Sequence, residues 1–178
     1  MGHAAGTAAF ARHYIRDLVY GANDGIITTF AVVAGVAGGA LSHTAILVVG
    51  AANLAADGLS MGVGNYLAIR AHESARQMEK LPVQEAYAWR HGLATLVAFV
   101  VAGALPLAPF FFPIARNHRF AWSVGVTLGA LFLVGAARGV VTADRWWKAG
   151  SEMLALGVVV AAAAYGAGAL AAIVMNGH

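Results

Sequence analysis

The sequence predicts an all-α integral membrane protein with five transmembrane helices, and two observations indicate this class. First, 60% of the 178 residues are hydrophobic and 11% are charged, with a mean hydropathy of +0.72. A soluble domain carries about 25% charged residues, so the polar residues here are too few to cover its surface. Second, the apolar residues form long runs without charge, and five helices of about 20 residues each use just over half the chain.

The first two spans are expected to form a helical hairpin. The first charge-free run lies between Asp24 and Asp57. It extends over residues 25–56, which is too long for one span. Gly38 and Gly39, followed by the polar residues 42–44, predict a turn within this run. We therefore expect the first helix over about 14–40 and the second over about 44–69.

The other three spans follow a polar stretch over residues 70–91, which we expect to be a short cytoplasmic linker. Charge-free runs predict the third, fourth and fifth helices over about 92–115, 120–142 and 151–174. Pro106, Pro109 and Pro113 predict a bent or fraying end for the third helix. Together these spans make residues 1–178 a single transmembrane domain.

The basic residues predict the orientation in the membrane, because cytoplasmic loops carry an excess of Lys and Arg. With the N-terminus inside, nine Lys and Arg residues lie on the cytoplasmic side and two lie outside. The nine are Arg12, Arg16, Arg70, Arg76, Lys80, Arg90, Arg138, Arg145 and Lys148, and the two are Arg116 and Arg119. We therefore expect the N-terminus inside and the C-terminus outside.

Composition also excludes several classes of function. The chain has no cysteine, which excludes disulfides, thiolate metal sites and thiol redox chemistry. The net charge of +3 fits basic cytoplasmic loops, and no stretch combines clustered basic residues with aromatics, so a nucleic-acid partner is not expected. Small-residue pairs four positions apart predict close helix packing or a homo-oligomer. These pairs are Gly21 and Gly25, Gly58 and Gly62, Gly125 and Gly129, and Gly135 and Gly139.

Asp24 and Asp57 are the candidate functional residues, because both lie within apolar spans. A carboxylate at the bilayer centre costs about 2.5–3.5 kcal/mol on insertion scales, so it is normally kept for a function. Asp24 lies eight residues beyond Arg16, and Met61 lies nine residues before Arg70. At about 1.5 Å per residue, Asp24 and Met61 both lie about 12–13 Å from the cytoplasmic boundary, with Asp57 one turn deeper.

The second helix carries a polar stripe, because Asn53, Asp57, Met61 and Asn65 recur every four residues and share one face. Carboxylate and amide oxygens with one thioether suit a dehydrated cation, and the thioether favours a transition metal over Mg²⁺ or Ca²⁺. We therefore expect Asp24, Met61, Asp57 and Asn53 to bind metal. Alternatively, Asp57 and the Asn residues only bond neighbouring helices, and Met61 only fills space.

The other polar residues predict less. Asp17, beside Arg16, is expected at the membrane interface. Glu73, Glu79 and Glu85 fall every six residues, a spacing that does not share one helix face, so a solvated linker is expected. Four histidines near span ends carry no pattern: His43, His72, His91 and His118.

Two segments resemble the vacuolar iron transporter family. They are YGANDGIITTFAVVAGVAGG over residues 20–39 and ANLAADGLSMGVGNYLA over residues 52–68, which together make 37 residues of the helical hairpin. The resemblance implies a dimeric five-helix transporter that moves Fe²⁺, and often Mn²⁺, out of the cytosol in exchange for protons. It also implies that Asp24 and Met61 line the ion path.

The chain departs from this family in two respects. Members with a developed metal-binding module have long Glu-rich cytoplasmic helices between the second and third spans, where this chain has only residues 70–91 with three Glu. The characterised plant and fungal type also has Glu at two positions that hold His13 and Asn53 here. The metal preference and the route of the proton therefore do not follow from the resemblance.

We therefore expect a divalent-metal/H⁺ antiporter that exports Fe²⁺ or Mn²⁺ across a prokaryotic-type plasma membrane, with no permanently bound cofactor. Its partners would be transition-metal ions, protons, the lipid bilayer and a second copy of the chain. The alternative is a non-transporting membrane protein of the same family that binds metal or a partner. An intramembrane hydrolase built on His13, Asp17 and Asp24 is a third option, but no hydrolase motif surrounds these residues.

Overall fold

The computed structural model describes residues 2–115 and 118–176, with side chains described from residue 13 onward. The described residues contain helices and turns but no strand. The elements are α1 (Gly2–Gly38), α2 (His43–Met78), α3 (Ala88–Gly103), the 3₁₀ turn η1 (Leu105–Leu107), α4 (Ala108–Phe111), α5 (Arg119–Thr142) and α6 (Trp146–Asn176).

Five helical segments of the described chain are long and apolar enough to cross a membrane, which confirms the predicted all-α class. They are His13–Gly38, His43–Met78, Ala88–Phe111, Arg119–Thr142 and Trp146–Asn176. Large apolar side chains on their outer faces are exposed, as on α2 at Leu59, Val63 and Leu67. The chain is therefore a multi-pass membrane protein.

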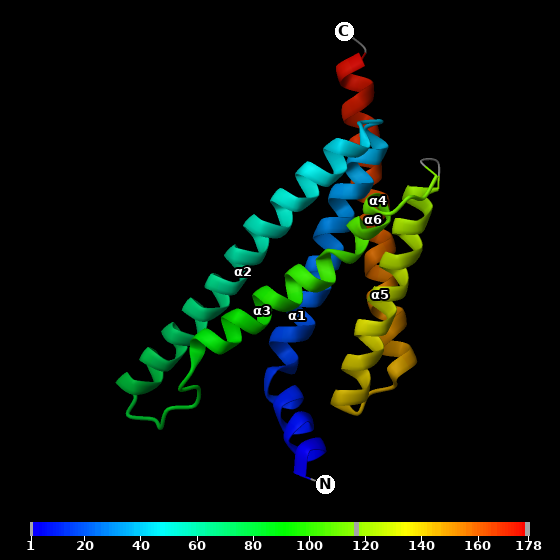
Figure 1. Ribbon diagram of the computed structural model, residues 1–178. Helices are drawn as coiled ribbons and strands as arrows, with labels where there is room; N and C mark the ends of the chain where they lie inside the picture. Colours follow the sequence, from blue (N-terminus) through cyan, green and yellow to red (C-terminus); the bar gives the residue numbers. More distant parts are fainter. Residues whose placement is uncertain (1, 116–117, 177–178) are drawn as a thin grey trace.

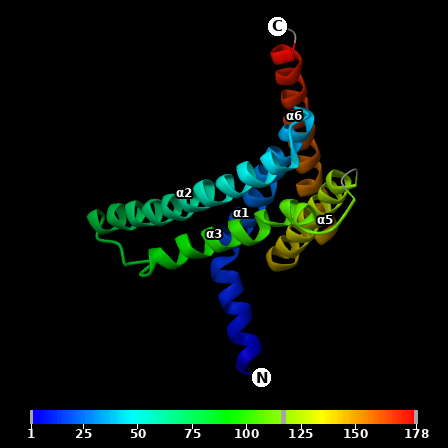
Figure 2. The ribbon, with the colours of Figure 1, turned by 45° about the horizontal axis from the view of Figure 1, so that its top comes forward.

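The chain reverses direction between successive spans, so its two ends lie at opposite ends of the molecule (Figure 1). The α2–α3 and α5–α6 turns lie toward the end that holds the N-terminus, and the α1–α2 turn lies toward the other. Figure 2 shows α2 and α3 as an antiparallel pair that leans away from α1. The end that carries the N-terminus is called the N-terminal end below.

The observed spans differ from the predicted ones mainly around residues 70–91. Helix α2 continues to Met78 instead of ending near residue 69, so the turn is confined to residues 79–87. The segment AHESARQM extends the helix because Ala, Glu, Arg, Gln and Met are good helix formers. The third span does bend where its prolines stand, since α3 ends at Gly103 and η1 and α4 follow. Ser123 of α5 donates a hydrogen bond to the Pro106 carbonyl at 2.6 Å, which satisfies a carbonyl at this bend.

Glycines allow the helices that carry the polar residues to pack closely. A Cβ at Gly25 of α1 would collide with the Phe99 carbonyl of α3, and a Cβ at Gly62 of α2 would lie 2.9 Å from the Gly92 carbonyl of α3. Helix α3 therefore packs against both α1 and α2. Three of the four predicted small-residue pairs contact neighbouring helices. The fourth pair, Gly125 and Gly129 on α5, faces open space.

Candidate functional site

The four residues predicted to bind metal lie on two helices. Asp24 is on α1, and Asn53, Asp57 and Met61 are on α2. All four side chains are half-buried within the single chain. They are therefore neither fully sealed in the core nor fully turned toward the surrounding lipid.

The polar stripe of α2 faces α1 at two levels. The Asn65 amide donates a hydrogen bond to Oδ1 of Asp17 at 2.9 Å. Asp24 lies seven residues beyond Asp17 on α1, and Asp57 lies eight residues before Asn65 on α2. Because the helices are antiparallel, these two pairs follow one register, and Met61 lies between them. The register thus places Asp24 and Asp57 at one level, whereas Asn65 belongs to the Asp17 level.

Several polar atoms near this level have no hydrogen-bond partner among the described residues. They include Nδ2 of Asn53 and the hydroxyl of Thr29, which are both buried. The Thr28 hydroxyl, in contrast, donates to the Asp24 backbone carbonyl at 2.8 Å. An unpaired buried amide costs free energy, so Asn53 has hydrogen-bonding capacity that the single chain does not use.

A second group of polar residues lies closer to the N-terminal end, around Asp17. This carboxylate is 2% exposed, and its Oδ2 is 2.5 Å from Nδ1 of His91 on α3. It also accepts a hydrogen bond from Asn65, whose amide reaches the Thr95 hydroxyl at 2.8 Å as well. Asp17 is the buried centre of a hydrogen-bond network that joins α1, α2 and α3, and its depth at the membrane interface stays a prediction.

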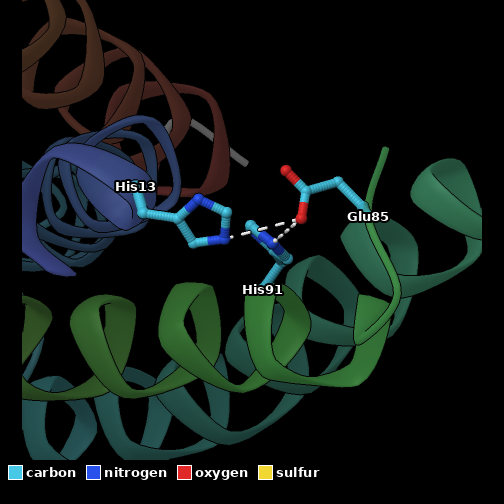
Figure 3. A group of neighbouring side chains, drawn as sticks. All are labelled: His13, Glu85 and His91. Carbon is cyan, nitrogen blue, oxygen red and sulfur yellow. Dashed lines mark hydrogen bonds and ion pairs between the residues drawn. The ribbon is translucent and has the colours of Figure 1, made fainter. Parts of the chain in front are cut away.

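The other ring nitrogen of His91 faces Glu85, as Figure 3 shows. Nε2 of His91 is 3.0 Å from Oε2 of Glu85, and Nε2 of His13 is 3.5 Å from the same oxygen. Among the side chains that the structure describes, this is the one group of three His, Asp or Glu residues whose ligand atoms could hold a metal ion. The three residues, His13, Glu85 and His91, are called the HEH cluster below.

Glu85 is held in place by a second buried glutamate. Glu73, near the end of α2, accepts hydrogen bonds from the backbone N–H groups of Gln84 and Glu85 at 3.1 and 3.0 Å. These bonds tie the 79–87 turn to α2 and place Glu85 beside His91. The expected solvated linker is therefore wrong for Glu73, which is buried, and for Glu85, which is partly buried.

A cavity of about 360 Å³ adjoins the HEH cluster at the N-terminal end. Arg16, Asn65 and His72 line it together with the three cluster residues. Since Asn65 belongs to the polar stripe of α2, the cavity adjoins the end of this stripe that lies nearest the N-terminal end.

The sequence of the chain matches known proteins over the same helices. The sequence model of the VIT family matches residues 15–81 and 73–169, which is most of the chain. This chain belongs to the VIT family. The similar proteins include "Vacuolar iron transporter 1" of Eucalyptus grandis, 28% identical over 88% of this chain and 86% of that protein. "Vacuolar iron transporter 1" of Arabidopsis thaliana is 26% identical over 87% and 85%. "Vacuolar iron transporter" of Toxoplasma gondii is 26% identical over 93% and 76%.

The alignments also show that relatives of this VIT-family chain carry additional residues. The alignment with the Eucalyptus protein extends over 214 positions, more than the 178 residues of this chain, so that relative carries residues with no counterpart here. The two segments that match the family meet at residues 73–81, at the end of α2 and the start of the turn. The compact 79–87 turn is consistent with a shortened interval between the second and third spans.

Sequence reasoning missed the buried network and the HEH cluster, although two weak signals pointed to them. Asp17 lies seven residues before Asp24, a spacing that places both on one face of α1. Thr95 lies four residues after His91, so these two polar residues share a face of the otherwise apolar α3. Neither signal shows that the two faces meet.

Proposed function

We propose that this VIT-family protein carries Fe²⁺, and also Mn²⁺, across the membrane out of the cytoplasm in exchange for protons. The observation that carries the proposal is the register of α1 and α2, which the Asn65–Asp17 hydrogen bond fixes and which places Asp24 and Asp57 at one level on half-buried faces of apolar helices. Two ionised carboxylates in this environment repel each other and lose hydration, so the site favours either a divalent cation or protons. The names of the VIT-family relatives, which are iron transporters, support iron as the substrate.

Competition between metal and protons for the same oxygens supplies the coupling. Each carboxylate that takes up a proton loses the negative charge that binds the metal, so protons from the outside release the ion. One divalent cation and two protons neutralise the two carboxylates equally. Met61 favours transition metals through its thioether, and the unpaired Asn53 amide provides a polar group further along the face.

The direction of transport and the assembly are part of the same proposal. Lys and Arg in the loops at the N-terminal end support a cytoplasmic N-terminus and therefore export through the C-terminal end. The half-buried α2 stripe supports a homodimer in which two α1–α2 pairs face each other across a shared path. The proposed location is a prokaryotic-type plasma membrane, although the similar proteins named above are eukaryotic and are named for the vacuole.

Uptake of Fe²⁺ and Mn²⁺ into proteoliposomes with an imposed pH gradient tests this function. We expect the purified protein to drive metal uptake into vesicles with an acidic interior, with release of protons, and protein-free vesicles to take up none. A folded protein that moves neither metal in either gradient direction contradicts transport. Metal-dependent thermal stabilisation without flux would instead identify the non-transporting alternative.

A further inference from the structure

We propose that the HEH cluster binds a divalent transition-metal ion at the N-terminal end of the bundle, at a site separate from Asp24 and Asp57. Two imidazole nitrogens and one carboxylate oxygen would coordinate the ion, and water would complete its coordination. The site goes beyond the proposed transport, because it would hold metal whether or not the helices carry metal across the membrane.

The distances within the HEH cluster match the size of a metal ion. In a tetrahedral site with metal–ligand bonds of about 2.0–2.1 Å, neighbouring ligand atoms lie about 3.3–3.4 Å apart. Oε2 of Glu85 lies 3.0 Å from Nε2 of His91 and 3.5 Å from Nε2 of His13. One ligand atom from each residue lies within 4.8 Å of the other two, so small side-chain rotations complete the triangle.

Asp17 prepares His91 for metal binding. Nδ1 of His91 is hydrogen-bonded to the buried Asp17 carboxylate, and Nε2 is directed at Glu85. A carboxylate behind a ligating histidine fixes its tautomer and orientation, and this arrangement recurs in metal sites. Asn65 donates to Asp17 in turn, so the position of the carboxylate is itself fixed. Asp17 is thus a positioning residue for the site.

Nε2 of His91, Nε2 of His13 and Oε2 of Glu85 are atom types that bind transition metals, and they converge on one position. Oε2 of Glu85 lies 3.0 Å from Nε2 of His91. His13 approaches the same carboxylate oxygen, and its ring is tilted against that of His91 with centroids 5.1 Å apart. Three possible ligand atoms from three segments of the chain at one position favour a metal ion.

Burial and charge allow the ion to enter and leave. The side chain of His91 is 4% exposed, that of Glu85 is 27% exposed and that of His13 is 49% exposed, so the cluster is closed on one side and open on the other. Its open side adjoins the 360 Å³ cavity, which His72 also lines. Two carboxylate groups, those of Asp17 and Glu85, lie near one guanidinium group, that of Arg16. Arg16 is itself paired with Asp17 at 3.4 Å, so acidic groups outnumber basic ones here.

The donor set selects the class of metal. Imidazole suits Zn²⁺, Fe²⁺, Co²⁺, Ni²⁺ and Cu²⁺, whereas Ca²⁺ and Mg²⁺ prefer sites made of oxygen alone. Three protein ligands with an open fourth position are typical of sites that exchange a ligand, whereas closed structural sites have four. The HEH cluster therefore fits a transition metal that binds reversibly.

Co²⁺ titration of the purified protein, monitored by the visible absorption of the bound ion, tests the proposal. The purification tag is removed, and all proteins carry Asp24→Ala and Asp57→Ala so that the intramembrane carboxylates contribute no binding. We expect saturable Co²⁺ binding that His13→Ala and Glu85→Gln each weaken at least tenfold, as measured by the Co²⁺ concentration at half-saturation. Both side chains are partly exposed, and size-exclusion chromatography confirms that the variants remain folded.

His43→Ala is the matched control, because His43 lies at the opposite end of the bundle and we expect its loss to leave Co²⁺ binding unchanged. Equal Co²⁺ affinity in the parent protein, His13→Ala and Glu85→Gln would overturn the proposal. Absence of saturable binding in the parent would also overturn it. Since the assay measures binding without flux, its failure is distinct from a failure of transport.

Discussion

Replacement of Asp17 by alanine tests whether the buried network stabilises the helix bundle. Asp17→Ala removes the acceptor of the His91 Nδ1–H group and of one Asn65 N–H group. Asn65 keeps its bond to the Thr95 hydroxyl, so two buried donors each lose one bond. Arg16 is 72% exposed, so the loss of its pairing with Asp17 contributes little.

The expected size of the effect follows from these lost bonds. Each buried donor left without an acceptor costs about 1–3 kcal/mol. With two such bonds lost, we expect Asp17→Ala to lower the free energy of unfolding by about 2–6 kcal/mol. Asp17→Asn retains an acceptor oxygen, so we expect its loss to be smaller.

Unfolding by SDS in mixed detergent micelles, monitored by far-UV circular dichroism, measures the difference. Asp144→Ala is the control, because Asp144 is exposed and bonds only the exposed Thr142 hydroxyl among the side-chain bonds of the described residues. Equal midpoints for Asp17→Ala and Asp144→Ala would refute the reasoning. A double-mutant cycle with His91→Ala should give a coupling energy of about 0.5–3 kcal/mol, as expected for residues in contact.

Two further predictions concern helix packing and orientation. Gly62→Ala places a Cβ 2.9 Å from the Gly92 carbonyl, whereas a Cβ at Gly64 of the same helix meets nothing within 4 Å. Both changes gain about 1 kcal/mol of helix propensity, but we expect Gly62→Ala to lose about 1–3 kcal/mol to overpacking, so that it unfolds at lower SDS than Gly64→Ala. Because the chain has no cysteine, Ala86→Cys and Thr44→Cys each introduce a single exposed thiol. In intact cells, a membrane-impermeant maleimide should label only Thr44→Cys, and the reverse pattern would contradict a cytoplasmic N-terminus.

Much of the fold could be predicted from the sequence because the membrane simplifies the pattern. Runs without charge mark the five spans, and the prolines near residue 106 mark the bend after α3. The end of α2 was less predictable, because the polar residues 70–78 continue the helix beyond the apolar run. Polarity indicates where a helix leaves the membrane, but helix propensity decides where it ends.

The candidate site was predictable only where one residue is unusual by itself. Asp24 is such a residue, because a carboxylate is rare within an apolar span. The partnership of Asp17 with His91 joins positions 74 apart in the chain and depends on how closely α1 and α3 pack. The place of Glu85 depends on hydrogen bonds from the turn to Glu73. Such contacts arise from tertiary packing, which no local pattern in the sequence specifies.

The most direct test of transport through the bundle compares the initial rate of Fe²⁺ uptake by the natural protein with that of Asp24→Ala in proteoliposomes. Asp144→Ala, reconstituted at the same protein-to-lipid ratio, controls for the loss of a carboxylate. We expect Asp24→Ala to fall to the rate of protein-free vesicles and Asp144→Ala to retain the natural rate. An undiminished rate in Asp24→Ala would contradict a path through the paired carboxylates.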